Sequence, residues 1–195
     1  MDDSFIASVI AAYAELYGPA TRVRRFSRTE PPPGDSAVVV YLPLEAERII
    51  PQGNLTLLAT AGFGSQEICV DFPCELGIEI RGSLDECAAA ALAEALVELA
   101  EVPLEGGHLF HDGQILTNVS LPVFLRFNTA MLVDWDSVDG FRFPQPLAEI
   151  GCLRVVPLFA EEMKFVESYA DRHLAYRALR IRGMDETDPD RDSTV

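Results

Sequence analysis

The chain has 195 residues, of which 15 are basic and 31 are acidic, giving a formal net charge of −16 at pH 7. A chain of this length buries enough surface to fold without disulfides or metals, and so negative a surface argues against binding to nucleic acid. The apolar runs are too short to span a bilayer, and the opening Met1-Asp2-Asp3 lacks the positive charge of a signal peptide. We therefore expect one cytoplasmic domain with no membrane segment.

The first half of the chain predicts one helix followed by four strands. Residues 2–20 place apolar side chains at three- and four-residue steps and end in Gly18-Pro19, which favours a helix. Strands are expected where β-branched and apolar residues gather between turn residues, at 21–27, 37–43, 54–62 and 74–82. In the last of these, apolar residues alternate with glutamates: Leu76, Ile78 and Ile80 against Glu75 and Glu79.

The second half adds the clearest helix, a hairpin, a strand and closing helices. Residues 83–101 begin with a capping box of Ser83 and Glu86, and leucines line one face. A hairpin is expected at 121–135, a core strand at 152–159, and one or two helices at 160–181.

The order of these elements predicts an α+β fold, because helices do not alternate strictly with strands. We expect a mixed or antiparallel β-sheet with helices packed mainly on one face. Residues 1–182 are assigned to this domain. Residues 183–195 have little apolar content and many acids, which predicts a disordered tail.

The stretch "LLATAGFGSQEICV" (residues 57–70) looks like a phosphate loop, because Gly62 and Gly64 follow an apolar strand. A dinucleotide loop needs a third glycine and a helix directly after it. Glu67 occupies the third glycine position, and the following residues read as strand and turn. The glycines therefore predict a bulge or a close backbone approach, and no nucleotide site.

The stretch "DWDSVDG" (residues 134–140) comes near to a calcium loop without matching it. Asp134 and Asp136 fit the first and third positions, but Val138 stands at the fifth and Asp139 at the sixth, where glycine is needed. The glutamate required at position twelve is also missing. We interpret these residues as an acidic turn beside an apolar strand.

The stretch "GGHLFHDG" (residues 106–113) offers His108, His111 and Asp112 as a possible metal or acid–base site. A third ligand is lacking, because His173 belongs to a distant helical segment, and the cysteines contain no C-x-x-C pair. Histidines in a glycine-flanked loop are typical of turns. We predict no catalytic residue, no metal site and no cofactor.

The helix at 83–101 and the loop after it carry acids without any base. Between Ser83 and Glu105 the six acids are Asp85, Glu86, Glu94, Glu98, Glu101 and Glu105. Glu94, Glu98 and Glu101, which we call the acidic row, fall at helical spacing opposite the leucines, where like charges cost about 0.2–0.5 kcal/mol per pair. The row is interpreted either as a solvated face or as a docking face for a basic partner. The loops with His111, Asp112, Asp134, Asp136 and Asp139 are the second candidate docking surface.

Several segments in order resemble the suppressor of fused (SUFU) domain family over residues 3–181. The segments are "VVVYLP", "LTLLATAGFGSQ", "CELGIEIRG", "AALAEALVELAEVPLEGGH" and "LRVVPLFAEEMKFVESYADRHLAYRAL". The chain departs from the family at Gly62-Phe63-Gly64-Ser65, where the family has glycine–methionine–serine, and at Cys74, where an arginine is frequent. It also lacks the additional C-terminal region of the animal protein, so the resemblance points to a bacterial relative.

The resemblance implies an α+β fold of the SUKH superfamily and the function of an immunity protein that binds and neutralises a polymorphic toxin, often a nuclease. Three functions remain open: a non-catalytic immunity protein with a basic toxin as partner, an adaptor of the same fold with another protein partner, and a small enzyme using His108, His111 and Asp112 or the carboxylates near Trp135. The oligomeric state is also open.

Overall fold

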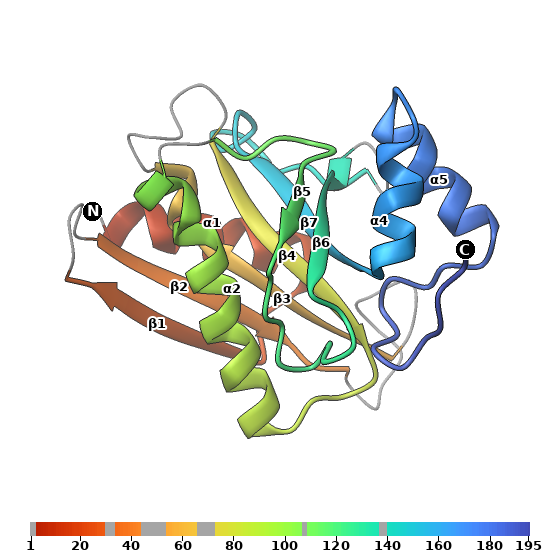
Figure 1. Cartoon of the computed structure of the whole chain (residues 1–195). Helices are drawn as coiled ribbons and strands as arrows, with labels where there is room; N and C mark the ends of the chain where they lie inside the picture. The colour runs from red at the N-terminus through yellow and green to blue at the C-terminus, as the bar shows by residue number, and fades with distance from the viewer. Residues whose placement is uncertain (1–2, 30–33, 44–53, 66–72, 107–108, 137–139) are drawn as a thin grey trace.

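The computed structural model describes residues 3–29, 34–43, 54–65, 73–106, 109–136 and 140–195, which form one seven-stranded sheet with helices on both faces (Figure 1). The strand order is β1-β2-β3-β4-β7-β6-β5. Neighbouring strands are antiparallel, except for β4 and β7, which are parallel. The sheet is therefore mixed and the fold is α+β, which confirms the predicted class.

The helices and strands follow the predicted order. The strands are β1 (Arg22–Arg28), β2 (Gly34–Tyr41), β3 (Leu55–Ala61), β4 (Cys74–Arg81), β5 (Ile115–Thr117), β6 (Thr129–Asp134) and β7 (Gly151–Leu158). The helices are α1 (Asp3–Tyr17), α2 (Glu86–Gly106), α4 (Ala160–Glu167) and α5 (Arg172–Ile181), with a short 3-10 turn, η1 (Phe63–Ser65). None of the helices in the described ranges combines the length and the apolar character that a membrane span requires.

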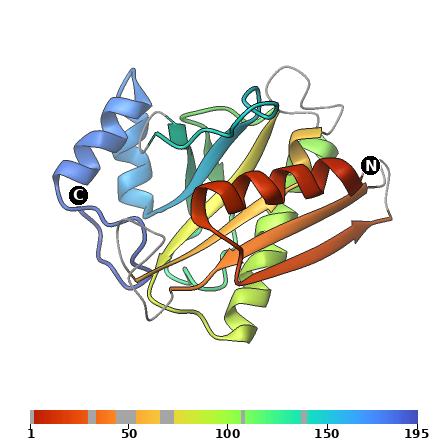
Figure 2. The same cartoon turned by 180° about the vertical axis from the view of Figure 1, so that it is seen from behind.

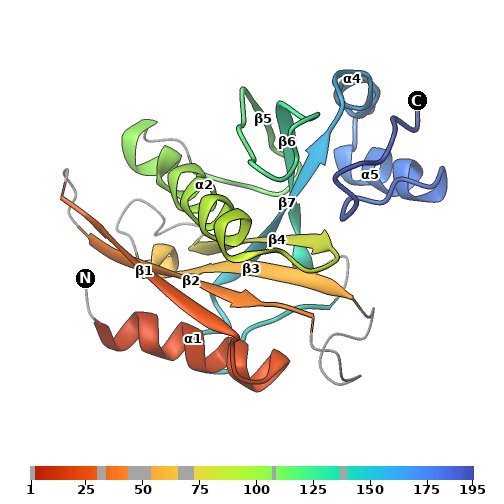
Figure 3. The same ribbon diagram turned by 90° about the horizontal axis from the view of Figure 1, so that it is seen from below.

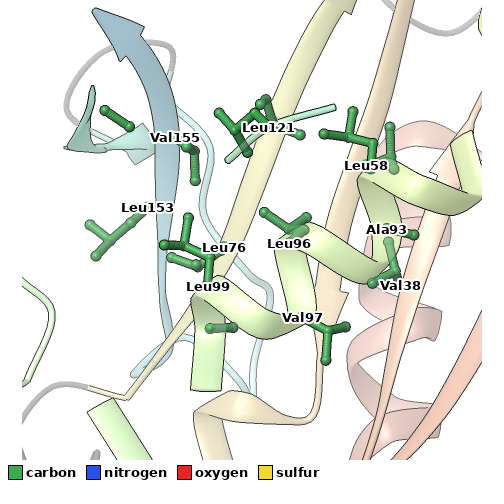
Figure 4. Close-up of a cluster of buried hydrophobic side chains, with 14 of the residues drawn as sticks. Val38, Leu58, Leu76, Ala93, Leu96, Val97, Leu99, Leu121, Leu153 and Val155 are labelled. Atoms are coloured by element: carbon green, nitrogen blue, oxygen red, sulfur yellow. The ribbon is translucent and has the colours of Figure 1, made fainter. Parts of the chain in front are cut away.

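Helix α2 covers one face of the sheet. Its leucines recur at helical spacing, and Leu92 and Leu96 are fully buried against Val38, Leu58 and Leu76 of the sheet (Figure 4). Burial of one such leucine contributes about 1.5–3 kcal/mol. The helix is thus fixed by its apolar face, and its acidic row points away from the sheet.

Helix α1 lies on the opposite face (Figures 2 and 3). Ile6, Val9 and Tyr13, at steps of three and four residues, are fully buried against the odd-numbered residues of β2, such as Val39. Because successive side chains of a strand point to opposite faces, alternate residues of β2 pack against α1 on one face and α2 on the other. That is why residues 36–41 form a continuous buried run.

Helices α4 and α5 pack on the other end of the sheet, on the same face as α1. Tyr176 and Leu179 of α5 are buried against Met131 of β6 and Val156 of β7. Residues 152, 154 and 156 of β7 share one face by alternation, and Cys152 belongs to the cluster under α1. Within the described residues, α1, α4 and α5 therefore share a face and α2 covers the other.

The predicted hairpin at 121–135 is partly wrong. The strand β6 is present, but it pairs with β5 and not with residues 121–127. Those residues form successive tight turns, in which Phe124 N–H donates to Leu121 O at 2.9 Å and Phe127 N–H donates to Phe124 O at 3.1 Å. The turns bring Leu121, Phe124 and Phe127 into the core beneath α2, so their apolar character serves packing without a strand.

The structure also differs from the expectation of a disordered tail at residues 183–195. Met184, Glu186, Thr187 and Arg191 are buried, and Arg81 N–H at the end of β4 donates to Thr187 O at 2.7 Å. The segment is held by specific polar contacts in place of the missing apolar residues. It is an ordered part of the domain.

Candidate functional site

The glycine turn after β3 does bind an anion, and the anion is a carboxylate of the protein itself. Glu75 of β4 is completely buried, and its carboxylate accepts hydrogen bonds from the N–H groups of Gly62, Phe63 and Gly64 at 2.9, 3.3 and 2.9 Å. Thr60 Oγ1 donates to the same carboxylate at 2.7 Å. Successive N–H groups of this kind form an anion-binding nest. The turn thus has the chemistry of a phosphate loop with its site filled from within.

The glycines are required by geometry. Gly62 has φ of +124°, and a Cβ there would lie 3.2 Å from the backbone oxygen of Asp35. A Cβ on Gly64 would lie 2.9 Å from Ile150 Cγ2. The predicted close backbone approach is therefore present, and it positions the N–H groups on Glu75.

Burial raises the pKa of Glu75 above its ordinary value of 4.5, and the hydrogen bonds offset this only in part. On the same face, the Tyr13 hydroxyl lies 3.7 Å from Cys152 Sγ, and burial raises the pKa of both groups.

The alternation of glutamates with apolar residues in β4 did not indicate that the Glu75 side chain is buried. The available signal was the turn itself, whose N–H groups require an acceptor.

A second set of buried charges surrounds Arg154 of β7. Its guanidinium lies 2.7 Å from Glu79 Oε2 and 3.1 Å from Glu186 Oε1, and it stacks over Trp135 at 4.9 Å from the ring centre. The Tyr176 hydroxyl also donates to Glu186 at 2.9 Å. Burial raises the pKa of Tyr176 above its ordinary value of 10.0. The cluster joins β4, β7, α5 and the C-terminal segment.

A polar pocket of about 480 Å³ opens beside this cluster. Its walls are the start of β3, the end of β4 and residues 183–187, with Arg180 of α5 at the rim. The arginines around it are already paired, Arg81 with Asp185 and Arg180 with Glu186 at 3.7 Å. The pocket therefore carries balanced charge that serves the attachment of the C-terminal segment.

The last residues are fastened by Glu162 of α4, which is completely buried. Its carboxylate pairs with the Arg191 guanidinium at 2.6 and 2.7 Å and accepts from Thr194 N–H at 3.1 Å. Arg191 also donates to Pro157 O of β7 at 3.0 Å. Burial alone would raise the pKa of Glu162, but the hydrogen bonds and charge of Arg191 bring it below 4.5.

Asp112, Asp134 and Asp136, three residues of the second candidate docking surface, are linked by hydrogen bonds. Asp134 N–H donates to Asp112 Oδ1 at 2.8 Å, and Asp136 N–H donates to Asp134 Oδ1 at 3.2 Å. Arg142 Nε donates to Asp136 Oδ2 at 3.0 Å. These carboxylates hold the loops together. Asp139 and His108 lie outside the described residues.

Of the residues considered for a possible acid–base site, His111 and Asp112 contact each other through the backbone oxygen of Asp112. His111 Nδ1 lies 2.8 Å from the backbone oxygen of its neighbour Asp112, whereas the Asp112 carboxylate lies 3.6 Å from Nδ1 of His173. The pair of Asp112 and His173 could not be predicted from their distance in the sequence, because it forms only when α5 folds back beside the loop. In the described ranges, no three His, Cys, Asp or Glu side chains are grouped so as to hold a metal ion.

The acidic row lies on the outer face of α2. Glu94 and Glu98 are exposed and Glu101 is half-buried. Among the described residues, Glu94 and Glu98 have no hydrogen-bond or ion-pair partner, in contrast to Glu86, which pairs with Arg22 and Arg24 of β1.

Comparison with solved structures finds several proteins with a similar fold. A homologue of SUFU (suppressor of fused protein) from Neisseria gonorrhoeae aligns with a TM-score of 0.67 and 14% identity over 100% of this chain and 98% of its own. The Sufu-Fu complex aligns with a TM-score of 0.64 and 11% identity over 97% and 92% of the two chains. Drosophila Suppressor of Fused aligns with a TM-score of 0.65 and 11% identity, covering 100% of this chain and 54% of that protein.

No curated protein matches the sequence. The profile of the family described as Suppressor of fused protein (SUFU), however, matches residues 40–192, from β2 through the ordered C-terminal segment. The chain therefore belongs to the suppressor of fused family.

Proposed function

We propose that this protein is a non-catalytic protein-binding module whose acidic row on α2 contacts a basic patch of its partner. The observation that carries the proposal is that Glu94 and Glu98 are exposed and have no partner in the described part of the chain. Exposed acids that repel one another on a helix are unfavourable for the free protein. Opposite charge on a partner would relieve this and accelerate encounter.

Two further observations support this proposal. The buried ionisable groups described above, Glu75, Arg154 and Glu162, have structural partners, so their charge is used within the fold. One structural neighbour is the Sufu-Fu complex, so the shared fold occurs in a protein–protein complex.

The finer proposal is that the partner is a polymorphic toxin, such as a nuclease, and that the protein is a cytoplasmic bacterial immunity protein related to the SUKH superfamily. A net charge of −16 would complement a toxin that binds nucleic acid. The alternatives are an adaptor with a non-toxin partner and, less favoured by the geometry at Asp112, an enzyme.

The docking face is tested by charge reversal. Purified partner, recovered from the source organism at low salt, would be titrated against wild type, Glu94→Lys/Glu98→Lys and Glu161→Lys/Glu167→Lys. The last variant is the matched control, because Glu161 and Glu167 are exposed acids of α4 on the other face of the sheet. We expect the α2 variant to associate about tenfold more slowly at low salt, with a weaker salt dependence. Equal association rates for the two variants would exclude α2.

The toxin assignment is tested separately. A gene neighbour encoding a basic domain would be expressed in a sensitive host with and without this protein. Restoration of growth by wild type, and not by Glu94→Lys/Glu98→Lys, would support the immunity function. Binding without any toxicity of the partner would favour the adaptor.

A further inference from the structure

The strand β1 is less buried than β2 and β3: its residues alternate between partly buried, on the face of Phe26, and exposed, on the face of Val23. No residue of β1 is buried, whereas all of β3 and the run 36–41 of β2 are. It is the outermost strand of the sheet (Figure 1), and no described residue pairs with its outer edge. Alternate N–H and C=O groups along this edge are therefore available to another strand.

The same strand concentrates positive charge in an otherwise acidic protein. Its sequence, RVRRFSR, contains four arginines: Arg22, Arg24, Arg25 and Arg28. Arg22 and Arg24 both pair with the single carboxylate of Glu86, at the start of α2. Two guanidinium groups share one carboxylate, so Arg22, Arg24 and Glu86 together carry a net positive charge.

From these observations we propose that the outer edge of β1 accepts an extended, acidic segment of a partner protein as an added strand. Backbone hydrogen bonds would supply affinity, and the arginines would select carboxylates on the incoming strand. Val23, whose side chain is 44% exposed, lies on the same face of β1 as Arg25 and provides an apolar contact there. This site has the opposite charge to the acidic row and is independent of the function proposed for α2.

A second copy of the chain is a poor occupant. Antiparallel pairing of β1 with β1 of another copy would place arginines opposite arginines, which is unfavourable in a sheet. The same arginines thus protect the edge from self-association while leaving it open to an acidic strand.

The test uses peptides of eight residues, acetylated and amidated, titrated into the full chain and followed by backbone amide NMR. The probe alternates glutamate with valine or threonine. One control replaces every glutamate by lysine, and another replaces every valine and threonine by proline, which keeps the charge but removes the strand. A single-stranded oligonucleotide is titrated as a second type of anion.

We expect the acidic probe to shift amides of β1 and its neighbour β2, with the proline peptide at least about tenfold weaker and the lysine peptide inactive. Absence of shifts in β1 at several millimolar probe would overturn the proposal. Equal binding of the proline peptide, shifts centred elsewhere, or tighter binding of the oligonucleotide to the same arginines would also overturn it.

Two variants test whether the arginines of β1 supply the positive charge that binds the acidic probe. Arg22→Gln/Arg25→Gln removes two positive charges while Glu86 keeps Arg24, and Arg177→Gln/Arg182→Gln removes two exposed arginines at α5 as the control. We expect about fivefold weaker binding of the acidic probe by the first variant only. Glu94→Lys/Glu98→Lys should bind the probe as tightly as wild type does. Failure of this site and failure of the α2 site are thereby distinguishable.

Discussion

Two buried glutamates each hold one segment of this domain in place, and they do so with different kinds of partner. Glu75, under the glycine turn, is surrounded by neutral donors: three backbone N–H groups and the Thr60 hydroxyl. Glu162, under the C-terminal segment, faces the full charge of Arg191. Both carboxylates are completely buried, yet the pKa of Glu75 is raised and that of Glu162 is lowered.

The comparison shows that burial alone does not decide the protonation of a carboxyl. Desolvation is the largest influence on the pKa of each group and raises it. At Glu162, the hydrogen bonds and charge of Arg191, together with the N–H groups of Phe159 and Thr194, outweigh desolvation and reverse the direction. The turn is thus held by hydrogen bonds from the backbone, and the C-terminal segment is held by a charge pair. The two contacts should therefore lose their stabilising effect at different pH values and in response to different mutations.

The largest effect is expected from breaking the charge pair. Arg191→Ala leaves a buried carboxylate without its counterion and should lower the free energy of unfolding by about 3–5 kcal/mol. The measurement is chemical denaturation beside Arg142→Ala, since Arg142 is 69% exposed and its pair with Asp136, which involves no residue of the C-terminal segment, is worth about 1 kcal/mol or less. Equal losses in the two variants would mean that the C-terminal segment is not fastened by Glu162.

An intermediate effect is expected from Glu75→Gln. The amide keeps one acceptor oxygen but turns an NH₂ group toward backbone donors, which should cost about 1–3 kcal/mol. Amide hydrogen exchange of residues 62–65 should accelerate in this variant, whereas exchange in α5 should not. Unchanged exchange in the turn would contradict the role of Glu75.

The dependence of stability on pH should have opposite signs at the two sites. A raised pKa means that folded Glu75 holds its proton more tightly than in the unfolded chain. Its contribution to stability is therefore present below pH 4.5 and is lost as the pH rises through the folded pKa. Glu162, with a lowered pKa, contributes above pH 4.5 and loses this as the pH falls through its folded value.

Denaturation curves of wild type, Glu75→Gln and Glu162→Gln between about pH 3 and 8 separate these contributions. The difference between wild type and Glu75→Gln should shrink or reverse as the pH rises, and that between wild type and Glu162→Gln should grow. Parallel differences for both variants would show that the two carboxyls titrate alike.

The smallest effect is expected from single hydroxyls beside each carboxylate. Thr60 Oγ1 donates to Glu75 and accepts from Leu76 N–H at 2.8 Å in the core, so Thr60→Val should cost about 1–1.5 kcal/mol. Thr194 Oγ1 donates to Glu162 at 3.1 Å near the surface, where water can replace it, so Thr194→Val should cost about 1 kcal/mol or less. Thermal unfolding of the two variants provides the comparison, and an equal shift would mean that burial of the hydroxyl does not matter.

Sequence reasoning was strongest where one period of apolar residues was long enough to define a buried face. The helix later found as α2 and the strand later found as β4 were predicted from such periods. It failed at residues 121–127, where apolar residues pack from turns, and at residues 183–195, where Glu186 is buried beside Arg154 and Arg191 beside Glu162. Neither the packing of turn residues nor ion pairs between distant residues leaves a periodic signal in the sequence.

The candidate site was predictable only in part. The exposed position of Glu94 and Glu98 follows from the leucines on the other side of the helix. The proximity of Asp112 to His173 could not be inferred, because the two residues belong to separate segments that only the tertiary structure brings together.

The sequence by itself determined the α+β class, the acidic character, the main helices and strands, and the departure of the glycine turn from a phosphate loop. Local periodicity and turn chemistry are sufficient for these because they depend on neighbours along the chain. Only the tertiary structure decided that Glu75 fills the turn, that Arg191 returns to Glu162, and that β1 is left at the edge. Those outcomes depend on which strands become neighbours, and contacts between residues far apart in the sequence are not encoded in any local pattern.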